Sequence, residues 1–211
     1  MLRIDDVALV HDRVRAAHSA LIADLLAQEL DATSPSRLPG WTIGHLLTHL
    51  ARNADSVVRR LRASATGTII EQYDGGLAGR AEQIEAGAGR PYEVLRLDVI
   101  ESAAALDELI PILPPATWEF ETPSSSGELQ SGITVLGRRE REVVLHHTDL
   151  GIGFEPDAWP PAMSAILVNE CLATITDRTS ITALAGWLTD RAGPPPLHPW
   201  MPVGQPPRRT D

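Results

Sequence analysis

Cysteine is almost absent from the 211-residue chain, which contains only Cys171. A single thiol cannot form a disulfide within the chain, and it cannot supply a zinc site built from several cysteines. The composition therefore fits a reducing compartment, and we expect the protein to be cytoplasmic. Any metal ion would have to be held by histidines and carboxylates.

Basic and aromatic side chains are also scarce. The chain has 18 lysines and arginines against 28 acids, a net charge of −10, and aromatic residues make up 4% of the total. Nucleic acids and anionic membranes favour a basic face, and single-stranded nucleic acids also favour stacking aromatics. No stretch approaches the roughly 18 consecutive apolar residues of a membrane span. We therefore expect neither a nucleic-acid nor a membrane partner.

Apolar residues recur every three or four positions in several segments, which is typical of amphipathic helices. The spacing predicts helices over about 5–30, 42–63, 134–151 and 162–178, and one or two helices over 79–113 with an interruption at 87–91. A short helix or strand–helix piece is expected at 181–191, and a polar loop at 117–132. Because few segments alternate with a period of two, the predicted fold class is an all-α bundle.

The stretch REREVVLHHTDLG, residues 139–151, has the most conspicuous grouping of histidines and carboxylates. On a helix, Glu142 and His146 share a face because they are four residues apart, and Asp149 joins the same stripe, whereas His147 points about 100° away. A carboxylate and an imidazole at this spacing can hold one divalent metal ion. Two ligands do not make a useful site, so a third should come from another segment.

The segment GHLLTHLARNAD offers His45 and His49, which also share a helix face. Either can meet Glu142 and His146 across a bundle core, where helical bundles usually assemble metal sites. Two imidazoles and one carboxylate leave coordination positions open, which is typical of a catalytic metal. His45, three residues after the expected N-cap Thr42, is better placed for a hydrogen bond at the helix start.

Simpler interpretations of these residues stay open. The pair Glu142 and His146 can be a solvated ion pair, and His147 an exposed or partner-facing histidine. Asp149 can orient a ligand histidine or pair with Arg139. A group of charged residues in the helical segment predicted over 79–113 is most simply a solvated helix face. The group comprises Arg80, Glu82, Glu85 and Arg90.

Three motifs occur in order between about Val7 and Pro161: LPGWTIGHLLTHLARNADSV, IEAGAGRP and REREVVLHHTDLGIGFEPDAWP. Together they resemble the mycothiol-dependent maleylpyruvate isomerase family, which belongs to the DinB-like superfamily of metal-binding four-helix bundles. The resemblance implies a DinB-like four-helix bundle over residues 1–160. Members usually carry a longer C-terminal domain, so residues 161–211, with ALAGWLTDR…LHPW and a Pro-rich tail, are expected to form a shortened C-terminal segment.

The resemblance also implies the site and its cofactors. It implies a divalent metal ion, zinc in the first instance, held by His49, Glu142 and His146, with mycothiol as the thiol cofactor. An arginine near the C-terminus assists catalysis in the family, and Arg191 is the candidate by position. The implied partners are a small-molecule thiol and an electrophilic substrate.

The implied activity is a metal- and thiol-dependent isomerisation of the maleylpyruvate type, in which the metal activates the thiol as a thiolate. A mycothiol S-transferase and a non-catalytic metal-binding or regulatory bundle are the alternatives. Metal-assisted hydrolysis with Asp149 or His147 as the base is a third. A homodimer is expected if the shortened C-terminal segment exposes an apolar surface.

Overall fold

A computed structural model describes residues 4–196 of the chain, which divides into two compact units. The first unit spans Met1–Ala158 and the second Trp159–Asp211. The first unit contains both helices that were predicted to carry the metal ligands.

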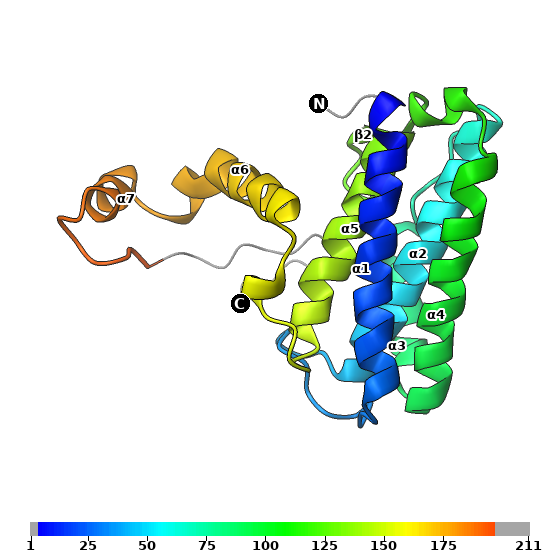
Figure 1. Cartoon of the computed structure of the whole chain (residues 1–211), viewed down its shortest axis with the longest axis horizontal. Helices are drawn as coiled ribbons and strands as arrows, with labels where there is room; N and C mark the ends of the chain where they lie inside the picture. Colours follow the sequence, from blue (N-terminus) through cyan, green and yellow to red (C-terminus); the bar gives the residue numbers. More distant parts are fainter. Residues whose placement is uncertain (1–3, 197–211) are drawn as a thin grey trace. The chain divides into compact units, whose positions relative to one another are not determined.

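Four long helices form the first unit: α1 (Val7–Ala27), α2 (Ile43–Ala65), α4 (Tyr92–Leu109) and α5 (Gly132–Asp149). They lie side by side as a four-helix bundle, and the shorter α3 (Gly76–Ala88) packs on α2 (Figure 1). Single 3-10 turns flank α1 and α4, namely η1 (Ile4–Asp6) and η2 (Ile110–Ile112). The predicted all-α bundle is confirmed.

Helices α1 and α5 run in the same direction. Arg13 of α1 bonds Glu140 of α5, and eleven residues further along α1 Asp24 bonds His147 of α5. Figure 1 shows α2 and α4 running the opposite way. Helices α2 and α4 run in the same direction, so a short turn cannot join them. The long segment that contains α3 connects them instead.

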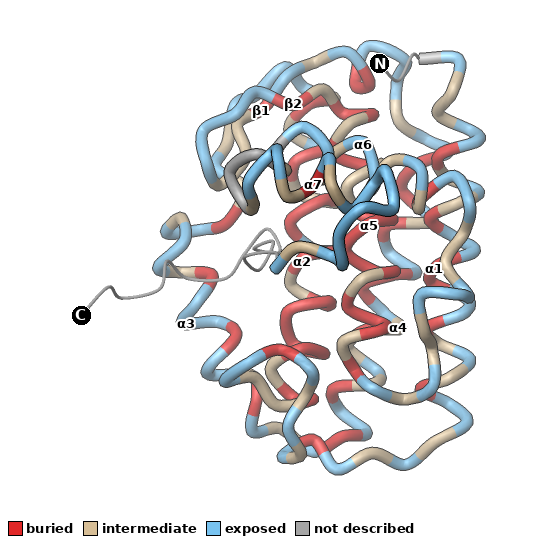
Figure 2. The backbone as a smooth tube through the Cα atoms, turned by 90° about the vertical axis from the view of Figure 1, so that its left-hand side faces the viewer, coloured by how far each residue is buried: buried red, intermediate tan, exposed pale blue. Residues whose placement is uncertain are grey.

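An apolar cluster fills one end of the bundle. It brings together the beginnings of α1 and α5 with the ends of α2 and α4, and the buried stretches of these helices face one another (Figure 2). Burying each large aliphatic side chain stabilises the fold by about 1.5–3 kcal/mol relative to exposing it. The cluster comprises Val10, Val14, Val57, Leu61, Leu106, Leu109, Ile110, Trp118, Ile133, Val135 and Leu136.

The connection between α4 and α5 is more ordered than the predicted polar loop. After η3 (Pro115–Trp118) it forms a small antiparallel hairpin, β1 (Glu121–Pro123) with β2 (Leu129–Ser131). The buried Arg60 of α2 donates to the Thr122 carbonyl at 3.1 Å and to Gln130 Oε1 at 3.3 Å. The prediction of a plain loop is wrong because three-residue strands are too short for a period-two signal, and a long-range arginine fixes them.

The start of α2 sets the position of His49. Thr42 caps the helix by accepting from the His45 backbone N–H at 3.3 Å, while His45 Nδ1 accepts from the Thr42 N–H at 3.2 Å. This reciprocal arrangement is a capping box. Gly44 allows close packing, since a Cβ there would stand 2.1 Å from the Ala88 carbonyl oxygen. Two turns of fixed helix therefore place His49 in the core.

The second unit contains α6 (Pro161–Arg178) and α7 (Ile181–Leu188). The helix predicted at 162–178 is confirmed, and the 181–191 piece is a helix. The last turn of the first unit is η4 (Pro156–Ala158). The predicted Pro-rich tail begins at Ala192, and its part from residue 197 onward, including the LHPW motif, lies outside the described residues. Within 4–196, no helix has the length and apolarity needed to cross a membrane.

Candidate metal centre

His49, Glu142 and His146 converge inside the first unit. Their potential ligand atoms all lie within 4.8 Å of one another, and all three side chains are buried. Oε2 of Glu142 is 3.0 Å from Nε2 of His49 and 3.5 Å from Nε2 of His146. The two histidine rings meet edge to face, with their centroids 4.8 Å apart. The structure therefore brings together the three residues that the sequence singled out.

His146 is held from behind by Asp149. Nδ1 of His146 lies 2.9 Å from Oδ2 of Asp149, so the ring donates its Nδ1–H to that carboxylate. This bond leaves Nε2 directed toward Glu142. Histidines that bind metals commonly donate their second N–H to a carboxylate in this way. Of the two interpretations left open for Asp149, the orienting one matches the geometry.

His49 is held from behind by a cation. Nη2 of Arg80, on α3, donates to Nδ1 of His49 at 3.1 Å, because a guanidinium has no acceptor to offer. Neutral His49 therefore carries its proton on Nε2 and donates it to Glu142. Arg80 is buried, and its guanidinium also packs over the rings of Trp41 and Tyr73. The Trp41 ring in turn contacts His49 edge-on at 5.6 Å.

The protonation states follow from burial and these bonds. Burial works to raise the pKa of Glu142, but hydrogen bonds from His146 and His49 outweigh it and hold this pKa well below its usual value. Burial lowers the pKa of His146, but hydrogen bonds to Asp149 and Glu142 prevail and raise it to about 9. Burial lowers the pKa of His49 to about 3. At neutral pH and without a metal, His146 therefore carries a positive charge, His49 is neutral and Glu142 is ionised.

The donor set fits a divalent cation. Two N–H groups now converge on one carboxylate oxygen, and a cation among the three groups would replace both protons. Two imidazoles and a carboxylate suit zinc and other first-row divalent ions, and they leave coordination positions open. Arg80 is the one misfit. A metal on Nε2 of neutral His49 moves the ring proton to Nδ1, where it would face the Arg80 donor.

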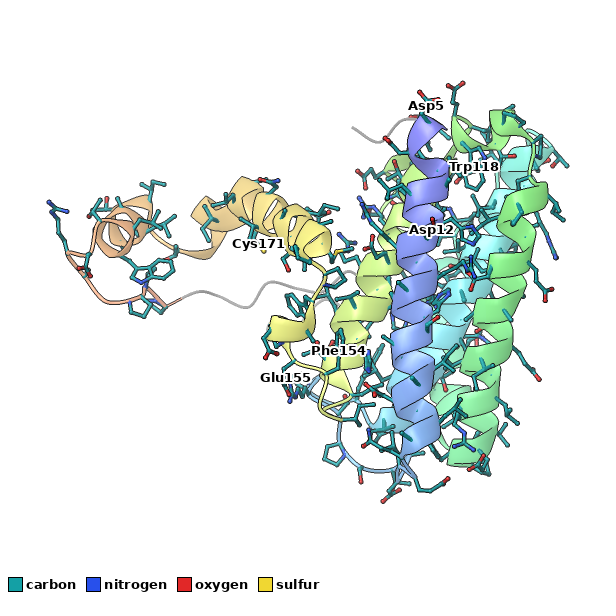
Figure 3. The ribbon with its side chains drawn as sticks, viewed as in Figure 1. Asp5, Asp12, Trp118, Phe154, Glu155 and Cys171 are labelled. Carbon is teal, nitrogen blue, oxygen red and sulfur yellow. The ribbon has the colours of Figure 1, made fainter. Side chains whose placement is uncertain are left out.

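The remaining histidines of the two motifs have other roles. His45 is the capping residue of α2, as its spacing from Thr42 indicated. His147 is buried, which contradicts the expectation of an exposed histidine: Nε2 bonds Asp24 at 2.9 Å and the ring stacks on Phe154 with centroids 4.0 Å apart. Figure 3 labels Phe154 on the segment that follows α5.

Arg139 ties the two ligand-bearing helices together. It is fully buried, and its Nη1 donates to the Leu50 carbonyl at 2.8 Å and to Asn53 Oδ1 at 2.9 Å. Burial lowers its pKa to about 10, so it stays charged at neutral pH. The alternative of an Asp149–Arg139 pair is not what the structure shows. Because Leu50 follows His49 directly, Arg139 fixes α2 against α5 at the level of the site.

Sequence reasoning missed Arg80, which was expected on a solvated helix face with Glu82 and Glu85. The structure buries Arg80 because it lies on the inner stripe of α3 with Ile84 and Ala88, at steps of four residues. This stripe is the signal that could have revealed it. A charged residue in line with two apolar ones on a helix needs a buried partner.

Arg191 belongs to the second unit, just after α7. It is exposed, and its Nη1 donates to the Thr189 carbonyl at 2.6 Å. Its assignment as a catalytic residue stays a prediction.

The fold and the site define a helical bundle with a buried histidine–carboxylate centre suited to a divalent metal. Residues 11–151 match the model of the mycothiol maleylpyruvate isomerase N-terminal domain, so the chain belongs to this family. The resemblance drawn from the three motifs is thereby confirmed. No match to the chain is found among curated proteins.

Solved structures agree with the family. The chain is similar to the crystal structure of a mycothiol-dependent maleylpyruvate isomerase, with a TM-score of 0.74 and 26% sequence identity, over 81% of this chain and 72% of that one. It is equally similar to a histidine-to-alanine mutant of such an isomerase, with a TM-score of 0.75 and 25% identity over the same shares.

Proposed function

We propose that the chain is a metal-dependent enzyme that uses mycothiol to isomerise a substrate of the maleylpyruvate type. The observation that carries the proposal is the convergence of His49, Glu142 and His146 within 4.8 Å in a chain of this family. Zinc is the metal we propose, because two imidazoles and one carboxylate are a common catalytic zinc set.

The chemistry requires a thiolate. A free thiol has a pKa of about 8.5, so little thiolate exists at neutral pH. A bound divalent cation supplies the charge that keeps a coordinated thiol deprotonated. The chain contributes a buried ligand cluster, in which Asp149 orients His146 and Arg139 fixes the backbone beside His49. These hydrogen bonds would hold the ligand side chains in fixed orientations when a metal ion is bound.

The isomerisation then needs no net consumption of thiol. The thiolate adds to one carbon of the cis double bond, and the electron pair of that bond moves toward the neighbouring carbonyl group. Rotation about the resulting single bond and expulsion of the same thiolate give the trans product. Arg191 is our candidate to hold a substrate carboxylate, since a guanidinium can bind it with two parallel hydrogen bonds.

The test is turnover of maleylpyruvate by zinc-loaded protein with mycothiol, followed by the product formed. We expect a trans isomer, with His49→Ala abolishing turnover and Arg191→Ala lowering it strongly. Arg62→Ala is the matched control, because it removes an exposed side chain near the end of the same helix, away from the cluster. A stable thioether product would instead identify an S-transferase, and metal binding without turnover of any electrophile would identify a binding module.

A further inference from the structure

A buried polar layer crosses the bundle one helical turn away from the metal centre. His18 of α1 is buried, its Nε2 lies 3.1 Å from Nε of Arg139, and its Nδ1 lies 3.4 Å from Oδ2 of Asp107 on α4. Arg139 of α5 in turn bonds the Leu50 carbonyl and the Asn53 side chain of α2. The layer therefore links all four long helices of the first unit.

The level of the layer follows from helix spacing. On α2, His49, Asn53 and Val57 follow one another at steps of four residues, and on α5 Arg139 comes three residues before Glu142. Residues three or four apart lie on one helix face, about one turn from each other. The layer thus lies between the ligand cluster and the apolar cluster that contains Val57. A shift of Arg139 would act on both ligand-bearing helices.

The two partners of His18 determine where its proton lies. A guanidinium offers only donors, so Arg139 donates its Nε–H to Nε2 of His18. The proton of the neutral ring is then on Nδ1, where it faces the Asp107 carboxylate. A second proton, on Nε2, would replace the acceptor by a donor that points at a charged guanidinium. The contact between His18 and Arg139 therefore requires a neutral ring.

The surroundings of His18 favour that neutral form. Burial lowers the pKa of His18, the hydrogen bond to Asp107 opposes this effect, and the charge of Arg139 lowers the pKa further. His11, seven residues earlier on α1, adds to the lowering and lies 3.5 Å from the other oxygen of Asp107. On the α2 side, Arg139 meets the neutral amide of Asn53. His18 is accordingly neutral at pH 7 and takes up a proton only in acid.

From this layer we infer that His18 is a positioning residue for the metal centre and acts through Arg139. While its ring is neutral, it holds the guanidinium that fixes α2 against α5. In acid, protonation of the ring breaks this contact and loosens the ligand cluster. The inference rests on the metal centre of the proposed function, but on neither the thiol nor the reaction. It makes the site sensitive to pH through a residue that does not bind the metal.

Two substitutions of His18 separate its hydrogen bonds from its titration. In His18→Gln the amide oxygen can accept from Arg139 and the amide N–H can donate to Asp107, without a titratable ring. His18→Leu removes both contacts. At pH 7.5 we expect His18→Gln to bind zinc as the parent does. We expect His18→Leu to bind it about tenfold more weakly, the lower end of the cost of losing a supporting group behind a metal ligand. Competition with a chelator measures these affinities.

His11→Leu is the matched control. It removes a histidine from the same helix and the same carboxylate, and it leaves the bond between His18 and Arg139 intact. Its zinc affinity should equal that of the parent. An unchanged zinc affinity in His18→Leu would overturn the inference even if this variant is less stable, because His18 would then only fill the core. An equal loss in His11→Leu would overturn it as well.

The acid response is measured on the metal-free protein by denaturant unfolding. The pKa of His18 in the folded protein lies below the ordinary 6.5, so the unfolded chain binds this proton at higher pH than the folded protein does. The stability associated with the neutral ring is complete above about pH 6.5 and is lost as the pH falls below it. Relative to His18→Gln, the unfolding equilibrium constant of the parent should rise by up to about tenfold between pH 7.5 and 5.5.

This comparison decides the question even if His18→Leu does not fold. A ratio of the parent to His18→Gln that stays constant over this pH range would overturn the inference. Failure of the proposed function looks different. If neither the parent nor any variant binds zinc, the metal centre itself is refuted, whereas zinc binding with equal affinity in all of them refutes only the role of His18.

Discussion

Nδ1 of His146 lies 2.9 Å from Oδ2 of Asp149, one turn further along α5. This bond sets which ring nitrogen of His146 faces Glu142, and it comes from a residue that the proposed metal would not touch. The spacing of three residues puts both side chains on one helix face, so the arrangement is encoded within a single turn of sequence.

Replacing Asp149 should therefore weaken metal binding. In Asp149→Ala the His146 ring loses the acceptor that orients it, and we expect zinc affinity to fall by roughly 10- to 100-fold, the usual cost of losing such a partner. Competition with a chromogenic chelator measures this. Asp24→Ala is the control, since it removes the carboxylate from His147 at the same distance of 2.9 Å. Equal losses in both variants would refute the orienting role of Asp149.

Arg80 should have the opposite effect. Its guanidinium donates to His49 Nδ1, the atom that must carry the proton when a metal occupies Nε2. In Arg80→Gln the amide oxygen can accept from that N–H, and a positive charge beside the cation is removed. We expect zinc affinity to rise about tenfold. Arg62→Gln, an exposed arginine near the end of α2, should leave it unchanged. A weaker zinc complex in Arg80→Gln would show that Arg80 supports the bound state.

Metal binding should release about one proton at pH 7. His146, with a pKa of about 9, is protonated in the metal-free protein, whereas His49, with a pKa of about 3, is neutral and Glu142 is ionised. Only His146 must lose a proton, so the logarithm of the apparent affinity should rise by about one for each pH unit between roughly pH 5 and 8. Calorimetry in buffers of different ionisation enthalpy counts the protons. Release of two protons would mean that His49 is also charged.

The close packing at the start of α2 gives a stability prediction. In Gly44→Ala the new methyl group would stand 2.1 Å from the Ala88 carbonyl oxygen and 3.1 Å from that of Ala32. Overpacking of this kind costs about 1–3 kcal/mol, more than the helix propensity gained. Gly89→Ala adds the same methyl group where nothing lies within 4 Å. Denaturant unfolding should separate the two variants, and equal stabilities would contradict the assigned contact.

The bundle and the three proposed ligands were predictable because their signals are local. Periodic apolar residues marked α1, α2, α4 and α5, and spacings of four placed Glu142 and His146 on one face. A second helix with two histidines on one face offered His45 and His49, and the resemblance to the family selected His49. The capping role of His45 followed from its distance to Thr42. Apart from the choice of His49, each inference needed only the geometry of one helix and the rule that bundle cores collect inward faces.

What the sequence did not reveal depends on distant contacts. His147 is buried only because Asp24 and Phe154 approach it from other segments. Arg80 was assigned to solvent because its charged neighbours on α3 outweighed the short stripe it shares with Ile84. The hairpin after η3 depends on Arg60, which comes from another element. Contacts of this kind have no periodicity along the chain.

Elemental analysis tests the central claim most directly. Protein purified with zinc and dialysed should contain about one zinc ion per chain, the stoichiometry expected for one such ligand set. Glu142→Gln should contain almost none, because it removes the carboxylate on which both histidines converge, while Glu140→Gln, two residues earlier on α5, should bind zinc as the parent does. Equal zinc in the parent and Glu142→Gln would contradict a metal centre at His49, Glu142 and His146.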